Sequence, residues 1–292
     1  MSLRAIAGHI KHKLFYNLAH LRYNLASKQR YFLNENDFET FVNKYKNVEA
    51  KAIWDYSDEG QEALAKERFK MLIAQNNGIV PQSVCEIGPG SGMLLKQFLD
   101  AGSTTVLGVD IQKPNNLDPR ITYHMGGVHE LDNLPDNSID FMYSIDAFEH
   151  IPNPTEGINN CLNKLKPGAK FYLQVGPTYY SPWGFHFYHI LKIPYIHVLF
   201  PEEYLEAYAK KHNHQFPWTN RVPASAYMHY FNNLPAHTQL LSLRYDYIWF
   251  CTRLLARYAD VFKAKQGVAF DDYFIGAIFT VLKKSSTTEY LR

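Results

Sequence analysis

A glycine-rich turn preceded by an acidic residue carries the strongest chemical signal in this sequence. The segment Glu86-Ile87-Gly88-Pro89-Gly90-Ser91-Gly92 follows a short apolar run and precedes a stretch with helical spacing, which predicts a turn between a strand and a helix. Glycines allow a ligand to approach the backbone closely, and the free N–H groups at a helix start favour anionic or carbonyl groups. The carboxylate of Glu86 suits a ligand with a cationic amine and would repel a diphosphate.

A second acidic residue, Asp110, ends the next predicted strand. A carboxylate at this point of a parallel sheet can accept hydrogen bonds from both hydroxyls of a ribose. The glycines are spaced G-x-G-x-G, and Met93 stands where a dinucleotide fingerprint has its last glycine. The two acids and the turn therefore favour a nucleoside that carries a cationic amino acid over a nicotinamide dinucleotide.

Strands that alternate with helices must position these residues. Such alternation is typical of βαβ units and a parallel sheet. Strands are expected over 83–87, 105–110, 121–125, 140–144, 170–175 and 272–283, and helices over 93–101 and 155–165, with a stop at 166–168. We therefore expect an α/β fold with a Rossmann-like, seven-stranded, mostly parallel sheet and helices on both of its faces.

Five segments in this order resemble the motifs of the class I S-adenosylmethionine-dependent methyltransferases. They are Glu86–Gly92 (motif I), Gly108–Asp110 (motif II), Leu134–Phe141 before the fourth strand, Ala147–Pro154 after it, and Leu165–Lys170 before the fifth. The resemblance covers about residues 80–176, with weaker support at 272–283. It implies S-adenosylmethionine as methyl donor and S-adenosylhomocysteine as product.

The resemblance also implies roles for individual residues. Glu86 would orient the methionine amine, Asp110 would hold the ribose, and Ile111 would pack on the adenine. The implied donor-binding residues are Glu86, Gly88, Gly90, Gly92, Asp110, Ile111, Gly127, Val128 and Ser144. The sequence departs from the family after the third strand, where no acid stands at the position that usually meets the adenine amino group. Backbone around Gly127, or Glu130, is expected to replace it.

Histidines near the strand ends are candidates for the base that the reaction needs. Methyl transfer is an in-line displacement at a sulfonium, so the protein mainly positions the acceptor and removes a proton. His150 follows the fourth strand and His186 follows the fifth, while the resemblance places Ser144 and Asp146 beside the transfer site. His186 and His189 have the spacing of a metal pair, but no third ligand is identifiable, and no metal is expected.

The chain is expected to divide into a core with additions on both sides. Residues 1–75 form an N-terminal helical extension or lid, 76–176 the donor-binding core, 177–270 an acceptor-binding insert or cap, and 271–292 the final core strand and a polar tail. Further helices are expected over 3–27, 36–49, 58–76, 202–211 and 247–263. The insert is rich in Tyr and Phe, which fits either an aromatic core or the wall of an acceptor pocket.

The first 30 residues contain six Lys or Arg and no acid. Residues 3–27 are open to three interpretations: a helix packed on the main domain, an interfacial helix on anionic lipid, or a transit peptide. No apolar run reaches the ~18 residues of a membrane span, and no signal peptide is evident. Three widely spaced cysteines suggest buried free thiols, and we expect a cytoplasmic protein with possible membrane association.

Together these features predict an enzyme that methylates a small molecule or a glycan, on oxygen, with a histidine as general base. The formal net charge of +2 gives no nucleic-acid footprint. Two alternatives stay open: a methyltransferase fold that has lost catalysis and serves as a binding partner, and a protein methyltransferase. The oligomeric state and the acceptor do not follow from the sequence.

Overall fold

The computed structural model describes residues 3–47 and 57–286, with side chains described from residue 13 onward. The end of the helix expected over 36–49 and most of the polar tail therefore lie outside the described residues. The chain forms two compact units. The sheet unit comprises Ala52–Gly176, Tyr227–Tyr245 and Ile278–Arg292, and the aromatic unit comprises Met1–Lys51, Pro177–Ala226 and Asp246–Ala277.

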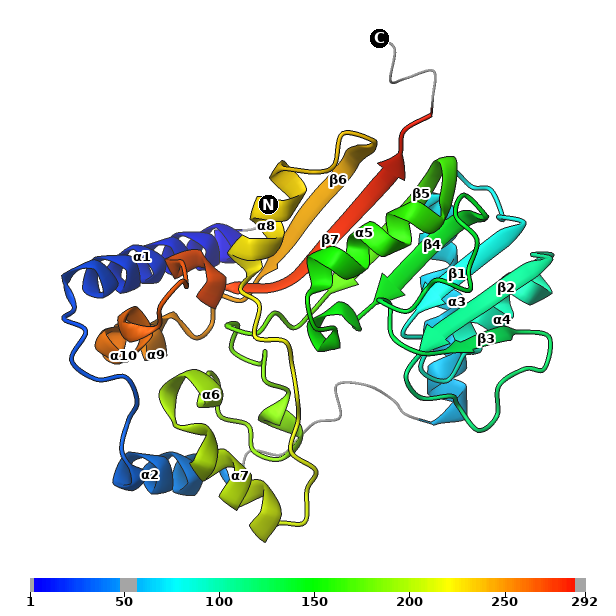
Figure 1. Ribbon diagram of the computed structural model, residues 1–292. Coiled ribbons are helices and arrows are strands. Elements are labelled where there is room, and N and C mark those ends of the chain that lie inside the picture. Colours follow the sequence, from blue (N-terminus) through cyan, green and yellow to red (C-terminus); the bar gives the residue numbers. More distant parts are fainter. Residues whose placement is uncertain (1–2, 48–56, 287–292) are drawn as a thin grey trace. The chain divides into compact units, whose positions relative to one another are not determined.

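A seven-stranded sheet in the order β3-β2-β1-β4-β5-β7-β6 forms the framework of the sheet unit. Its strands are β1 Ser83–Ile87, β2 Thr105–Asp110, β3 Thr122–Met125, β4 Ile139–Ile145, β5 Leu165–Val175, β6 Thr238–Tyr247 and β7 Ile275–Lys284. Strands β1 to β5 pair in parallel and β7 runs antiparallel to β5 (Figure 1). The predicted fold class is thereby confirmed. The carboxyl ends of β1, β2, β3 and β4 lie at one edge of the sheet.

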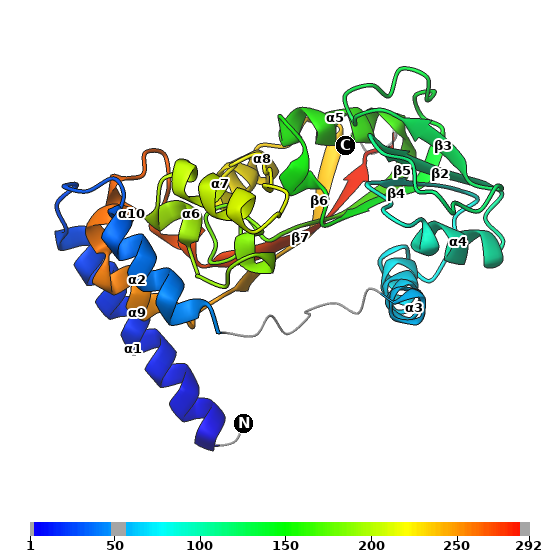
Figure 2. The same cartoon turned by 90° about the horizontal axis from the view of Figure 1, so that it is seen from below.

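Helices cover both faces of this sheet. Helices α3 (Asp58–Gln75) and α4 (Met93–Asp100) lie on one face, and α5 (Pro154–Lys164) lies on the other (Figure 2). Ser57 caps α3 by accepting a hydrogen bond from the backbone N–H of Gly60. Leu72 of α3 and Phe98 of α4 are fully buried in one hydrophobic core with the strand side chains. This packing holds α3 beside α4, next to the glycine turn that starts α4.

Three sequence predictions need correction. The prediction missed β6, a largely exposed strand whose residues carry little of the alternating apolar pattern that marks a half-buried strand. The helix expected over 247–263 is instead the end of β6, a loop, and two short helices that break at Tyr258. The expected stop at 166–168 lies within β5, because strand pairing already begins at Leu165. Gly168, in a left-handed conformation, lies where the register of this pairing shifts.

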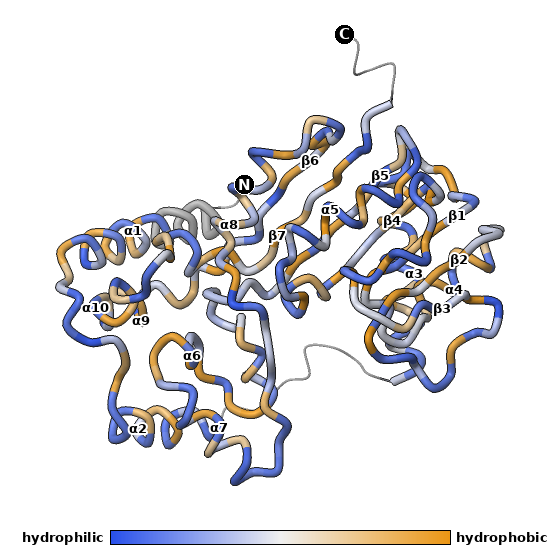
Figure 3. Tube along the Cα trace, in the orientation of Figure 1, coloured by the Kyte–Doolittle hydropathy of each residue, from blue (hydrophilic) through white to orange (hydrophobic). Residues whose placement is uncertain are grey.

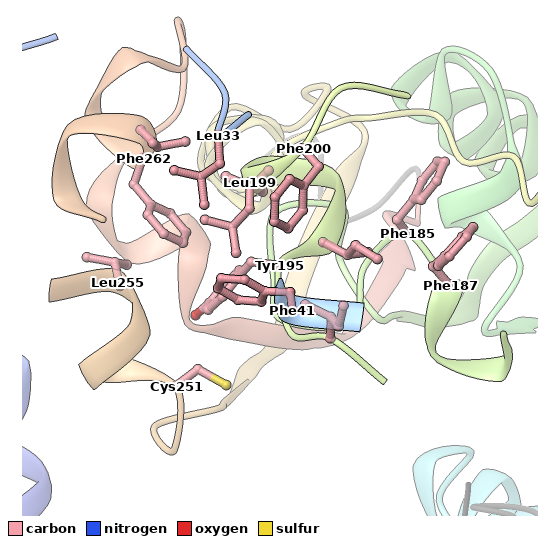
Figure 4. Packing of buried hydrophobic residues seen from close by; sticks show 14 of the residues in the cluster. Leu33, Phe41, Phe185, Phe187, Tyr195, Leu199, Phe200, Cys251, Leu255 and Phe262 are labelled. Atoms are coloured by element: carbon pink, nitrogen blue, oxygen red, sulfur yellow. The ribbon is translucent and has the colours of Figure 1, made fainter. Parts of the chain in front are cut away.

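The aromatic unit has its own core, built largely from Tyr and Phe side chains (Figure 4). Its helices, together with α8 at its boundary with the sheet unit, are α1 Leu3–Leu25, α2 Glu35–Tyr45, α6 Ile196–Leu199, α7 Glu202–Lys211, α8 Ala224–Asn232, α9 Thr252–Arg257 and α10 Ala259–Ala264. Ring pairs such as Tyr195 with Phe262, whose centroids lie 5.0 Å apart edge to face, fill this core. Much of the aromatic content after residue 170 therefore stabilises the fold. No described helix is long and apolar enough to cross a membrane.

Candidate functional site

The glycine turn between β1 and α4 requires its glycines. Gly88, Gly90 and Gly92 all have positive φ angles of 75°, 53° and 75°. A Cβ atom on Gly88 would lie 2.4 Å from the Cβ of Ala147, and one on Gly92 would lie 2.5 Å from a methyl carbon of Leu117. The close approach to Ala147 at Gly88, and the positive φ angles of all three residues, favour glycine along the backbone path that opens α4.

A cavity of about 300 Å³ lies over this turn. Its lining residues come from α3, the turn, the start of α4 and the end of β4: Gln61, Leu64, Ala65, Arg68, Glu86, Gly88, Pro89, Gly90, Ser91, Met93, Leu94, Ile145 and Asp146. The sequence predicted four of these residues, namely Glu86, Gly88, Gly90 and Asp146. The contribution of α3 was missed, because no local motif indicates which face of that helix meets the turn.

The carboxyl group of Glu86 is buried in this cavity without an opposite charge bound to it. Glu86 is 4 % exposed, and no described cation forms an ion pair with it. It is in register with Tyr143 of β4, whose hydroxyl donates a hydrogen bond to Oε2 at 2.9 Å. Burial raises the pKa of Glu86 to about 8, so much of it is protonated at neutral pH. A cationic ligand group placed here would favour the ionised carboxylate.

Asp110 lies at the same edge of the sheet, at the end of β2. Its Oδ1 accepts a hydrogen bond from the backbone N–H of Gln112 at 3.1 Å, and its carbonyl accepts one from Gly126 at 3.0 Å. Its negative charge contributes to raising the pKa of Glu86 and, after burial, that of Tyr123 to about 12. The structure therefore brings the two predicted acids into electrostatic contact at the carboxyl edge.

The other predicted donor-binding residues are not among the lining residues of this cavity. Ile111 is 71 % exposed beside Asp110, which leaves its side chain free to pack on a ring. The N–H of Gly127 donates to the carboxylate of Glu130 at 3.2 Å, and Val128 is buried. Ser144 is fully buried, and its hydroxyl donates to the carbonyl of Ile87 at 2.8 Å, so it supports the turn from below.

Asp146 occupies the turn after β4 with a φ of 56°, and each of its carboxylate oxygens accepts a hydrogen bond. Arg68 Nη2 of α3 lies 3.0 Å from one of its carboxylate oxygens, and Gln174 Nε2 of β5 lies 2.7 Å from the other. Burial raises the pKa of Asp146, while both donors act in the opposite direction. The ion pair with Arg68 joins α3 to the end of β4. Sequence patterns gave no sign of either partner, because both are distant in the chain.

His150 belongs to the sheet unit and lies at the end of a single 3₁₀ turn, Phe148–His150, after Asp146. Its side chain is exposed. The preceding residue, Glu149, is almost fully buried, and no described side chain donates a hydrogen bond to its carboxyl oxygens. Burial raises the pKa of Glu149 well above its usual value, and the charge of Asp146 adds to this effect. A buried, protonated carboxyl next to the candidate base was not predicted.

His186 belongs to the aromatic unit. It has a φ of 59° and begins the 3₁₀ turn Phe187–His189. Its ring lies 6.0 Å from that of Tyr188. The structure therefore places the two candidate histidines in different units, each near the end of a strand or in the loop that follows it.

A large part of the chain matches a known protein family. Residues 55–232 match the family described as "Methyltransferase domain". Two curated relatives are ubiquinone biosynthesis O-methyltransferases, from Hydrogenovibrio crunogenus (24% identity, covering 44% of this chain and 61% of the relative) and from Idiomarina loihiensis (26% identity, covering 36% and 46%). A solved S-adenosylmethionine dependent methyltransferase from Mesorhizobium loti is 15% identical, with a TM-score of 0.43 over 69% of this chain and 90% of that one.

The chain thus spans about half of the length of the curated relatives that it matches. The family match extends from α3 to the end of α8 and so covers parts of both units. It includes the glycine turn, Glu86, Asp110 and Asp146. The resemblance inferred from the sequence motifs is confirmed: this chain belongs to the methyltransferase-domain family, whose members use S-adenosylmethionine in a Rossmann-like fold.

Proposed function

We propose that this protein transfers the methyl group of S-adenosylmethionine to an oxygen atom of a small molecule or glycan. The observation that carries the proposal is the buried carboxyl of Glu86 over the glycine turn. A methionine ammonium would give it the opposite charge that it lacks, while Asp110, at the same sheet edge, would accept the two ribose hydroxyls.

In the proposed reaction the acceptor oxygen attacks the methyl carbon as the carbon–sulfur bond breaks. The bonding electrons stay on sulfur, which leaves as the thioether of S-adenosylhomocysteine, and the acceptor proton passes to a base. His150 is our first candidate for this base, because it shares the sheet unit with the cavity and follows Asp146 closely. His186 is the second candidate.

In this scheme Asp146 would be a positioning residue. Since Arg68 and Gln174 already occupy its two oxygens, it would hold α3 over the donor and shape the transfer site. Oxygen as the acceptor atom is supported by the two relatives that are named O-methyltransferases. We assign acceptor binding to the residues after β5, since long inserts at the ligand face of a sheet commonly carry specificity.

The proposal is tested with S-adenosylmethionine labelled in its methyl group, incubated with the full chain and a panel of hydroxylated small molecules, glycans and peptides. We expect label in an O-methyl ether of a small molecule or glycan, with one S-adenosylhomocysteine formed for each methyl transferred. Label found only in peptide would support a protein methyltransferase instead. Tight donor binding without any labelled product would support the non-catalytic alternative.

A further inference from the structure

A second cavity, of about 150 Å³, lies entirely within the aromatic unit. Six of its lining residues are aromatic: Tyr31, Phe32, Tyr179, Tyr180, Phe185 and Phe200. A volume of this size holds one six-membered ring with small substituents. Aromatic walls favour a planar, apolar body through edge and face contacts.

Lys265, at the end of α10, brings a positive charge to this cavity. The residue is 7 % exposed, and its ammonium nitrogen lies 3.8 Å from the ring centre of Tyr31 and 3.6 Å from that of Phe32. Among the described residues, the ammonium donates a hydrogen bond to the carbonyl of Tyr31. No described carboxylate forms an ion pair with it. An ammonium has three N–H donors, so at least one is available to a ligand.

The other polar residues of the cavity do not balance this charge. Glu202 is neutralised by Arg221, whose Nη2 lies 2.8 Å from each of its carboxylate oxygens. The Nε2 atom of His197 lies 2.6 Å from the carbonyl oxygen of Tyr179. Because a carbonyl oxygen only accepts hydrogen bonds, this nitrogen carries the hydrogen. Burial lowers the pKa of His197 to about 3, so the ring is neutral. Burial also raises the pKa values of Tyr179 and Tyr180, which keeps both phenols uncharged.

We propose that this cavity binds a small planar aromatic anion of the benzoate type, with its ring between the aromatic walls and its carboxylate on the ammonium of Lys265. A buried cation without an opposite charge costs free energy, and a carboxylate supplies both the charge and the acceptors that it lacks. Binding at this cavity requires neither the methyl donor nor methyl transfer, so this proposal can be tested independently of the proposed function.

The test is a calorimetric titration of the full chain, without methyl donor, with benzoate, the neutral analogue benzamide, and acetate. We expect benzoate to bind at least about tenfold more tightly than either, because only benzoate has both the ring and the charge. The variant Lys265→Met should lose this preference, whereas Lys265→Arg should keep part of it. Lys210→Met, at an exposed position of α7, is the matched control and should bind like the unaltered protein.

Folding of each variant is checked through its near-ultraviolet circular dichroism, which reports on the packing of the Tyr and Phe side chains in the aromatic unit. Equal affinities for benzoate and benzamide would overturn the proposal. So would an unchanged preference for benzoate in a folded Lys265→Met protein. A direct readout is the titration of the Lys265 ammonium by nitrogen-15 NMR, whose midpoint should move to higher pH when benzoate is bound.

An independent observation concerns the surface of α1. Leu14, Leu18, Leu21 and Leu25 are 66 %, 42 %, 55 % and 77 % exposed and recur at helical spacing. They fall on the side of α1 opposite to Tyr16, Ala19 and Tyr23, the residues that pack into the aromatic core. Figure 3 shows hydrophobic and hydrophilic residues along the coloured part of this helix. The leucine stripe formed by these four residues thus has no described packing partner within the chain.

The charged residues in and near α1 indicate which kind of surface this leucine stripe contacts. The sequence has no Asp or Glu before Glu35, while Lys13 and Arg22 of α1 and the nearby Lys28 are exposed cations. A helix with an apolar stripe and only basic charges fits an anionic lipid surface. We infer that α1 lies on an anionic bilayer with its leucine stripe inserted at the boundary of headgroups and acyl chains.

Sedimentation with vesicles tests this inference. The full chain should sediment with vesicles of phosphatidylcholine and phosphatidylglycerol, and much less with phosphatidylcholine alone. Leu18→Ser/Leu21→Ser should reduce binding at least about tenfold, since each lost leucine removes apolar burial. Leu240→Ser/Leu241→Ser, which alters two exposed leucines of β6, is the control and should bind normally. A lack of vesicle binding, or a dimer in solution that the Leu18→Ser/Leu21→Ser pair dissociates, would contradict it.

Discussion

Two cavities described above contain buried ionisable groups of opposite kind: the cavity over the glycine turn, for which we propose the methyl donor as ligand (the donor cavity), and the cavity of the aromatic unit (the aromatic cavity). In the sheet unit, the carboxyl of Glu86 is buried and forms no ion pair with a described Lys or Arg; in the aromatic unit, the amine of Lys265 is buried and forms no ion pair with a described carboxylate. Each group pays a desolvation cost that a ligand of opposite charge would offset. The same physical argument therefore assigns a cationic ligand to one cavity and an anionic ligand to the other.

The two cavities differ in how the chain builds them. The donor cavity is centred on one continuous segment, from β1 through the turn into α4, so its central residues are neighbours in the sequence. The aromatic cavity takes residues from three distant stretches, around 31–32, 179–221 and 265. A motif can reveal the first kind of site, whereas the second becomes visible only after folding.

The largest effect is expected from removing the base. His150→Asn should lower kcat by about 1,000-fold, within the usual range for general-base catalysis, and leave donor affinity nearly unchanged. His186→Asn should also lower kcat more than donor affinity. Single-turnover kinetics with labelled donor measures both quantities. Unchanged rates in both variants would show that neither His150 nor His186 is the base.

The next largest effect is expected at the ribose site. Asp110→Ala removes two charge-assisted hydrogen bonds to the ligand, so the dissociation constant for S-adenosylmethionine should rise by about 100-fold. The fold should survive, since within the protein the Asp110 side chain accepts only the backbone N–H of Gln112 among the hydrogen bonds described. Asp132→Ala, at an exposed position, serves as the control. Calorimetry that finds normal affinity in Asp110→Ala would remove the ribose assignment. Benzoate binding should be the same in both variants.

A smaller and more specific effect is expected at Glu86. Because its pKa is about 8, the free protein holds a proton there at pH 7, and a bound ammonium should expel it. Donor binding should therefore release close to one proton at pH 7 and tighten as the pH rises toward 8. Glu86→Gln should bind about tenfold more weakly and release none. Calorimetry in buffers of different ionisation enthalpy counts the protons, and equal release by both proteins would refute the assignment.

The smallest effect concerns the stability contributed by Lys265. Burial lowers its folded pKa from 10.5 to about 7, so the unfolded chain binds more protons between these values. The free energy of unfolding should therefore rise with pH across this window, by about 1–2 kcal/mol once solvent screening is allowed for. Lys265→Met should lack this contribution. Urea unfolding of both proteins at pH 7 and pH 10 measures it, and parallel pH profiles would contradict the buried, uncompensated ammonium.

The sequence allowed the sheet unit to be predicted because its signals are local. Apolar runs marked β1, β2 and β4, and the glycines marked a turn whose positive φ angles only glycine adopts readily. The edge strand β6 was missed because it is largely exposed and lacks a clear alternating pattern. The break at Tyr258 between α9 and α10 was missed because no Gly or Pro stands there.

The sequence predicted those candidate-site residues whose position is set by their own segment of the backbone, such as a residue directly after a strand. Glu86 and Asp110 follow strands directly, so their place at the sheet edge could be inferred. Arg68 on Asp146 is a contact between residues far apart in the chain, and periodicity on α3 does not specify it. The ammonium of Lys265 among aromatic rings is of the same kind, since Tyr31 and Lys265 come together only in the folded aromatic unit.

The central claim is that the cavity over the glycine turn binds S-adenosylmethionine through Glu86 and Asp110. Calorimetric titration of the full chain with S-adenosylmethionine, S-adenosylhomocysteine and NAD in parallel tests it most directly. The account predicts micromolar binding of the first two ligands and none of NAD, because a diphosphate would meet the two acids at the sheet edge. Absence of binding by the methionine nucleosides, or comparable binding of NAD, would contradict it.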